Sequence, residues 1–109
     1  MAQQTNQSAE HSILVNEILV ELSKTGTCTV WKNSTGVAKS EGRYISFGLK
    51  GSADIIGILE PHGQFIAVEV KTGNAKQSLQ QKKFEEMVKR RGGRYAVCRS
   101  VTDALNLVG

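Results

Sequence analysis

Two carboxylates and a lysine stand at the ends of two short apolar segments of this sequence. Asp54 is the second residue of the segment 53–59. Glu69 follows fifteen residues later and begins the triplet Glu-Val-Lys. This triplet ends at Lys71, the last residue of the segment 65–71. Two carboxylates can hold a hard divalent cation, and a neighbouring lysine can help to position a water molecule. Hydrolysis of a phosphodiester bond needs this combination, so the three residues form a candidate nuclease site.

The apolar residues around the triplet indicate a buried strand. Both segments are rich in β-branched residues and a turn at 61–63 separates them, so they are predicted to form a hairpin. Side chains alternate along a strand, which puts Glu69 and Lys71 on one face with Phe65 and Ala67. The other face is wholly apolar, as in a strand covered on both sides. A solvated strand face is the alternative, but these neighbours favour a buried Glu and Lys that are paired or bound to a metal.

The elements that must position these residues follow from hydrophobic periodicity and from turn residues. Apolar residues recur at helical spacing near the N-terminus and again after the Glu-Val-Lys triplet, and glycines end both segments. The predicted order is a helix at 8–23, a strand at 27–33, a loop-rich stretch at 34–52 that could hold a short strand at 43–47, strands at 53–59 and 65–71, a helix at 77–91, a strand at 94–98, and a short helix from a cap at Ser100 to Leu107.

This order predicts an α/β fold with a mixed central β-sheet that is flanked by helices on both faces. The helix at 77–91 lies between two strands and therefore indicates a βαβ crossover, which would make the strand at 94–98 parallel to the strand at 65–71. The length of the chain fits one domain. We expect a disordered lead-in over residues 1–9 and a single domain over residues 10–109, with the core order αβββαβ.

Basic residues gather in the second half of the chain. Nine of the fourteen Lys and Arg residues lie between Lys71 and Arg99, where the only acids are Glu85 and Glu86. Such asymmetry suits a polyanionic partner such as DNA, although an ordinary solvated basic helix gives the same pattern. No apolar run is long enough to span a membrane, and the polar N-terminus is unlike a signal peptide. We therefore expect a cytoplasmic protein without a membrane partner.

The order and spacing of the motifs resemble the PD-(D/E)xK nuclease superfamily, and in detail its VRR-NUC family. Asp54 and the triplet 69–71 correspond to the carboxylates and lysine of the superfamily motif. Residues 31–36 (Trp-Lys-Asn-Ser-Thr-Gly) resemble the family's Trp-Arg-Asn-Asn-Thr-Gly segment, and residues 81–84 (Gln-Lys-Lys-Phe) resemble its Gln-x-x-Phe helix signature. The resemblance covers nearly the whole chain, from about residue 11 to residue 105, and implies a restriction-endonuclease-like core.

The resemblance implies a role for each residue of the site. Asp54 and Glu69 would ligate Mg²⁺ or Mn²⁺, with the backbone carbonyl of Val70 as a third ligand. Lys71 would orient or polarise the attacking water. Gln81 would support the site from the following helix, and the helical pattern agrees, because Gln81 shares one side of that helix with two apolar residues and should face the sheet.

The first helix departs from the family pattern. The family places a glutamate near the start of this helix, where the present chain has His11. His11 falls on the apolar face of the predicted helix, so it could replace the glutamate as a weak or water-mediated ligand. A histidine in the core or on the surface near a fraying helix end is the alternative. Glu17 is the second candidate for the ligand.

The resemblance also implies how the protein would act. Small stand-alone members of the family, of viral or bacterial type, imply homodimers that act on branched DNA. The leading hypothesis is therefore a metal-dependent, structure-specific DNA endonuclease, a homodimeric Holliday junction resolvase. Three apolar regions could form its dimer interface, namely Val30 with Trp31, the segment 44–47, and the C-terminal helix with Leu105 and Leu107. The segment 44–47 is favoured, because it lies beside Asp54 in sequence. The alternatives are a nickase, flap nuclease or duplex nuclease of the same chemistry, and a degenerate nucleic-acid-binding module. The candidate phosphate contacts are Lys32, Lys50, Lys76, Lys82 and Lys83.

Overall fold

The protein forms a four-stranded mixed sheet with helices on both faces, as the sequence predicts. The computed structural model describes residues 7–109. Its elements are α1 (Gln7–Lys24), β1 (Cys28–Lys32), β2 (Gly36–Ser40), β3 (Arg43–Phe47), β4 (Ile55–Leu59), β5 (Gln64–Val70), α2 (Leu79–Arg90), β6 (Arg94–Cys98) and α3 (Val101–Val108). The sheet order is β1-β4-β5-β6, with antiparallel pairs up to β5 and a parallel pair of β5 with β6. The predicted βαβ crossover is therefore confirmed.

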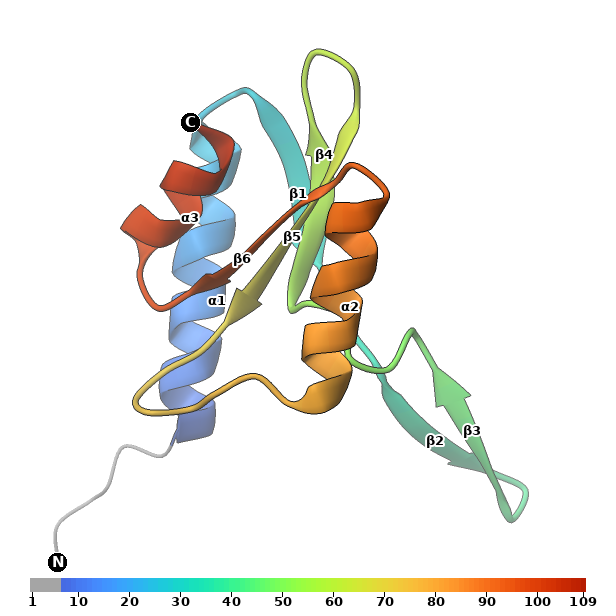
Figure 1. Ribbon diagram of the computed structural model, residues 1–109. Helices are drawn as coiled ribbons and strands as arrows, with labels where there is room; N and C mark the ends of the chain where they lie inside the picture. Colours follow the sequence, from blue (N-terminus) through green and yellow to red (C-terminus); the bar gives the residue numbers. More distant parts are fainter. Residues whose placement is uncertain (1–6) are drawn as a thin grey trace, which may run out of the picture.

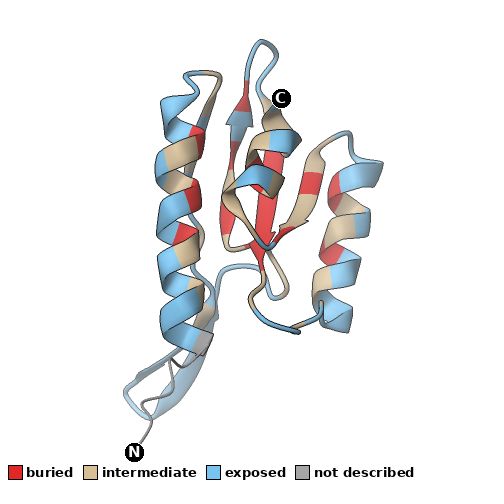
Figure 2. Cartoon of the chain, turned by 90° about the vertical axis from the view of Figure 1, so that its left-hand side faces the viewer, coloured by how far each residue is buried: buried red, intermediate tan, exposed pale blue. Residues whose placement is uncertain are grey.

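The helices divide between the two faces of the sheet. α1 and α3 lie together on one face and α2 covers the other (Figure 1). One core cluster lies between α1, α3 and the sheet and includes Ile18, Leu22 and Val68. A second and smaller cluster lies between the sheet and α2 and includes Phe84 and Val88. The buried sides of α1 and α2 face the sheet that lies between these two helices (Figure 2).

Strand β5 is covered on both faces, which is the prediction that matters most for the site. Val68 and Val70 belong to the core cluster under α1, whereas Ala67 belongs to the cluster under α2. Glu69 lies between the two valines in sequence and is only 3% exposed. Alternation puts it on the α2 face with Ala67. The alternative of a solvated strand face is thus wrong.

Helix α2 begins two residues later than predicted, because Ser78 caps it. The Ser78 hydroxyl accepts from the backbone N–H of Gln81, and the Gln81 side chain accepts in return from the backbone N–H of Ser78. This reciprocal arrangement is a capping box, whose Ser-x-x-Gln signature is present in the sequence. Gln77 precedes the helix, and its side-chain amide donates to Glu85 and to the hydroxyl of Tyr95.

The stretch predicted as loop-rich contains a complete hairpin. β2 and β3 pair with each other and with no other strand of the described chain, and they project away from the sheet (Figure 1). The turn between them is made by Glu41 and Gly42, which both have positive φ, as tight hairpin turns require. The prediction missed β2 because its sequence, Gly-Val-Ala-Lys-Ser, has little intrinsic preference for a strand.

The N-terminal prediction needs one correction. Helix α1 begins at Gln7, so residues 7–9 are helical and do not belong to a disordered lead-in. The rest of that predicted segment, residues 1–6, lies outside the described residues. Within residues 7–109, no helix combines the length and the apolar character needed to cross a membrane.

Candidate active site

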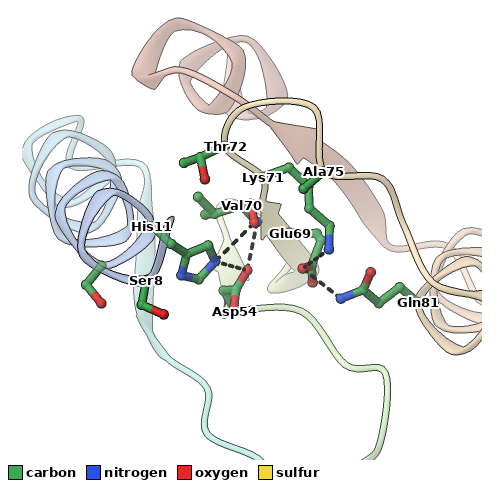
Figure 3. A pocket seen from close by; sticks show the side chains of 10 residues that line it. Ser8, His11, Asp54, Glu69, Val70, Lys71, Thr72, Ala75 and Gln81 are labelled. Atoms are coloured by element: carbon green, nitrogen blue, oxygen red, sulfur yellow. Dashed lines mark hydrogen bonds and ion pairs between the residues drawn. The ribbon is translucent and has the colours of Figure 1, made fainter. Parts of the chain in front are cut away.

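One pocket gathers the residues that the sequence singled out for chemistry. It has a volume of about 460 Å³ and lies where β4 begins, β5 ends, and the first turns of α1 and α2 approach the sheet. Figure 3 shows the side chains converging on it from these four elements. The predicted site residues that line it are His11, Asp54, Glu69, Val70, Lys71 and Gln81.

The register of the β4–β5 hairpin brings the two carboxylates together. Ile55 pairs with Val68, so the residue before Ile55 comes opposite the residue after Val68. Those residues are Asp54 and Glu69. The Asp54 carboxylate is held by the backbone N–H of Val70, which donates to Oδ2 at 2.8 Å. A pairing that shifts by one residue would turn Glu69 to the other face, so the hairpin fixes the site.

The Glu69 carboxylate has one satisfied and one unsatisfied oxygen. Its Oε2 accepts a hydrogen bond from Gln81 Nε2 at 3.0 Å and lies 3.5 Å from Lys71 Nζ. Its Oε1 is buried and has no hydrogen-bond partner among the described residues. Burial, and after it the negative charge of Asp54, raises the pKa of Glu69 to about 8, while Lys71 acts in the opposite direction. These surroundings therefore favour the protonated form of Glu69.

The oxygen atoms of this pocket suit a hard divalent cation. An unpartnered buried carboxylate oxygen on Glu69, the carboxylate of Asp54 and the carbonyl of Val70 are the ligand types that Mg²⁺ and Mn²⁺ prefer. Across residues 7–109, no group of three or more His, Cys, Asp or Glu side chains is arranged to hold a metal. A cation here would thus depend on two carboxylates and a backbone carbonyl.

His11 reaches the pocket but acts as a hydrogen-bond donor. Its Nε2 lies 3.1 Å from the carbonyl oxygen of Val70 and 3.3 Å from Asp54 Oδ2. A backbone carbonyl can only accept, so Nε2 carries the proton in this arrangement. His11 therefore offers no lone pair at Nε2. It donates to the Asp54 carboxylate and to the Val70 carbonyl, the two groups that the sequence predicts as metal ligands.

Glu17, the second candidate for the first-helix ligand, is not brought to the site. It is exposed and lines a separate groove with Val20 and Val101. Six positions separate it from His11, a spacing that turns it to a different side of the helix. The five lysines proposed to contact DNA are all exposed and none lines the pocket.

Comparison with known proteins identifies the family of the chain. Residues 7–102 match the family model of the VRR-NUC domain. The chain belongs to the VRR-NUC domain family. A solved structure described as a VRR_NUC domain is 27% identical in sequence, with a TM-score of 0.56 over 86% of this chain and 89% of the other. No curated protein matches the sequence.

This VRR-NUC domain also uses a residue that the sequence analysis missed. Arg99, the residue after β6, donates to the carbonyls of Gly73 and Ala75 at 3.1 and 2.6 Å. Those carbonyls belong to the loop that follows Lys71, and Thr72 and Ala75 of that loop line the pocket. Arg99 thus holds one wall of the site. No local motif marks it, because its partners lie 24 and 26 residues away in sequence.

Proposed function

We propose that this protein is a metal-dependent, structure-specific DNA endonuclease that resolves Holliday junctions as a homodimer. Membership of the VRR-NUC family makes it a nuclease-family domain. The observation that carries the proposal is the buried Glu69 carboxylate, which keeps one oxygen unpartnered beside Asp54 and Lys71. A fully structural Glu would have both oxygens satisfied, because an unsatisfied buried polar atom costs stability.

The residues of the pocket have distinct roles in this proposal. Asp54, Glu69 and the carbonyl of Val70 would hold Mg²⁺ or Mn²⁺. A cation bound there would relieve negative charge on the scissile phosphate and lower the pKa of a coordinated water. Lys71, whose side chain is 14% exposed, projects into the same pocket and can orient an attacking water or contact a phosphate oxygen. Gln81 holds Glu69 by Oε2 and so leaves Oε1 free for the cation.

The basic surface supports DNA as the substrate. The chain carries a formal charge of +4, and the lysines of α2 and of the loops before β4 and α2 are exposed. Contacts of lysine with phosphates position a nuclease on its substrate but do not read sequence. Recognition by the shape of the DNA is therefore the expected mode.

The projecting hairpin supports a dimer. The side chains of Val37, Tyr44, Ile45 and Phe47 are between 46% and 73% exposed, and both edges of the two-stranded sheet are free within the described chain. The register puts Ile45 and Phe47 on one face of the hairpin and Val37 and Tyr44 on the other. An isolated two-stranded sheet is marginally stable in water, so a second copy that covers the face with Ile45 and Phe47 would stabilise it. Two sites related by a two-fold axis would suit a four-way junction, which is nearly two-fold symmetric.

Cleavage of a substrate panel tests this function. Labelled four-way junctions, flaps, nicked duplexes and linear duplexes are incubated with the protein, with Mg²⁺, with Mn²⁺ or with a chelator. We expect paired cuts at symmetry-related positions in the junction, only with a metal present. Asp54→Asn is the matched control, which keeps the shape of the side chain and should bind DNA without cutting it. Efficient cleavage by Asp54→Asn would exclude this pocket as the active site. Preferential cutting of flaps or nicked duplexes by the wild type would favour a flap nuclease or nickase over a junction resolvase.

A further inference from the structure

A second groove lies between α2 and the segment that precedes β4. It has a volume of about 350 Å³, within the range of roughly 300–1,000 Å³ that is common for ligand pockets. Its lining comes from the segment before β4 and from one side of α2, namely Leu49, Lys50, Gln80, Lys83, Phe84 and Met87. The mechanism above uses none of the apolar side chains in this groove.

The groove is built by close packing between the two segments. The backbone of Gly51 approaches α2 so closely that a Cβ at this position would lie 2.6 Å from the carbonyl oxygen of Gln80. Gly51 also has a positive φ of 85°, which residues other than glycine rarely adopt. Figure 1 shows this segment passing beside the beginning of α2 on its way to β4. The groove therefore has a fixed wall opposite the helix.

The groove combines an apolar floor with a basic rim. Leu49 is 58% exposed and Met87 is half-buried, so both present apolar surface to an occupant. Lys50 and Lys83 are exposed on the rim, and among residues 7–109 no Asp or Glu side chain lines the groove. This pairing suits an occupant with one flat apolar face and a negative charge attached to it, which describes a nucleotide.

The position of the groove relates it to the cleavage site. Gln80 lines the groove and the next residue, Gln81, lines the active-site pocket and holds Glu69. A DNA strand whose backbone lies at the pocket can thus place a neighbouring nucleotide at the groove. A base that is stacked and paired within a duplex cannot turn its face to this floor, whereas an unpaired base can.

We propose that this groove binds one unpaired nucleotide of the DNA substrate, with its base on Leu49 and Met87 and its phosphate at Lys50 and Lys83. The inference rests on the proposed nuclease function and adds a basis for its preference among DNA structures. An unpaired nucleotide occurs at flaps, at bulges and at a branch point whose terminal base pairs have opened, but not in a continuous duplex. The groove therefore selects DNA in which pairing is interrupted beside the scissile bond.

Binding measurements on two DNA ligands test this site. One is a fluorescently labelled duplex, and the other is the same duplex with a single unpaired nucleotide; both are titrated by anisotropy in a metal-free buffer, so that no cleavage interferes. Leu49→Ser should weaken binding of the DNA with the unpaired nucleotide by roughly fivefold to tenfold, since it removes one apolar contact. Its binding to the continuous duplex should change by less than about twofold. The double variant Lys50→Gln, Lys83→Gln should weaken both ligands and reduce the salt dependence.

Leu79→Ser is the matched control, because Leu79 is also an exposed leucine (67%) and begins α2, the helix that lines the groove, but does not itself line the groove. It should leave both affinities unchanged, and thermal unfolding should show that Leu49→Ser folds as stably as the original protein. An equal effect of Leu49→Ser on both ligands, or none on either, would overturn the groove assignment while leaving the nuclease proposal in place. A wild-type protein that binds neither DNA would overturn the groove assignment, and the cleavage panel tests the nuclease proposal separately.

Discussion

Gln81 Nε2 donates to Glu69 Oε2 at 3.0 Å and thereby joins the first turn of α2 to the buried carboxylate of β5. The orientation of the Gln81 amide is fixed from its other end, because its oxygen accepts from the backbone N–H of Ser78 at 2.9 Å. The same side chain therefore completes the helix cap and supports the site. Substitution of Gln81 can separate its role in the helix cap from its hydrogen bond to Glu69.

Gln81→Glu should keep the cap and lose the support. A glutamate can accept from the Ser78 N–H as glutamine does, but it faces Glu69 with a second carboxylate and no donor. We expect cleavage at neutral pH to fall by roughly 10- to 100-fold, as for other residues that orient metal ligands. The pH–rate profile should also move to higher pH, because a like charge raises the pKa of Glu69 further.

Gln81→Ala is the companion variant. It loses the side-chain acceptor for the Ser78 N–H as well as the donor to Glu69, while the Ser78 hydroxyl still caps the backbone N–H of residue 81. Its melting temperature should therefore fall below that of Gln81→Glu, while its profile moves less. A Gln81→Glu protein with full activity and an unchanged profile would show that the hydrogen bond to Glu69 has no part in the reaction.

The raised pKa of Glu69 predicts a pH dependence of stability. Its pKa is about 8 in the folded protein against 4.5 as the reference value. The folded state thus binds more protons than the unfolded state between these values, so this group's contribution to stability is complete below pH 4.5 and is lost as the pH rises through 8. Without metal, the free energy of unfolding should fall more steeply from pH 6 to pH 9 in the wild type than in Glu69→Gln.

Chemical denaturation at several pH values measures both slopes. Addition of Mg²⁺ or Mn²⁺ should stabilise the wild type most at high pH, because the cation competes with the proton for the carboxylate. Parallel slopes for the two proteins would mean that Glu69 ionises normally in the folded state.

Substitutions of His11 can distinguish a metal ligand from a hydrogen-bond donor that positions the metal ligands. In the structure it donates to Asp54 and to the carbonyl of Val70, so a side chain that can still donate should replace it in part. We expect His11→Gln to retain roughly tenfold more cleavage activity than His11→Ala. Titration with Mn²⁺ should show similar metal affinity for both. Equal and severe loss of metal affinity in the two variants would instead identify His11 as a ligand.

The sequence predicts the centre of this site better than its surroundings. Alternation along 65–71 and the turn at 61–63 are local patterns, and together they determine the hairpin that sets Asp54 opposite Glu69. The direction in which His11 points depends on how α1 packs against the sheet, and the contacts of Arg99 join distant segments, so no local pattern contains either. The cap at Ser78 is different, because its signature is visible in the sequence and would have placed the start of α2 correctly.

The projecting hairpin makes the proposed dimer testable at one residue. Ile45 pairs with Ala38 and shares a face of the hairpin with Phe47, and it is 53% exposed, so it contributes little to the fold of one chain. A charge at the centre of an apolar interface is costly unless it is paired. Ile45→Asp should therefore weaken dimerisation by roughly tenfold or more without lowering the melting temperature of the remaining monomer. Sedimentation equilibrium at micromolar concentration measures the change.

The cutting pattern then links assembly to function. Ile58→Asp is the matched control, since Ile58 is a similarly exposed isoleucine (48%) in β4, which belongs to the four-stranded sheet and not to the hairpin. It should remain a dimer and make paired cuts in a four-way junction, whereas Ile45→Asp should nick single strands, because each chain supplies one set of carboxylates. A wild-type monomer that makes paired, symmetric cuts would rule out the dimer. A wild-type monomer that cuts only one strand would point to flaps or nicks as the substrate, because a single site then suffices for the reaction.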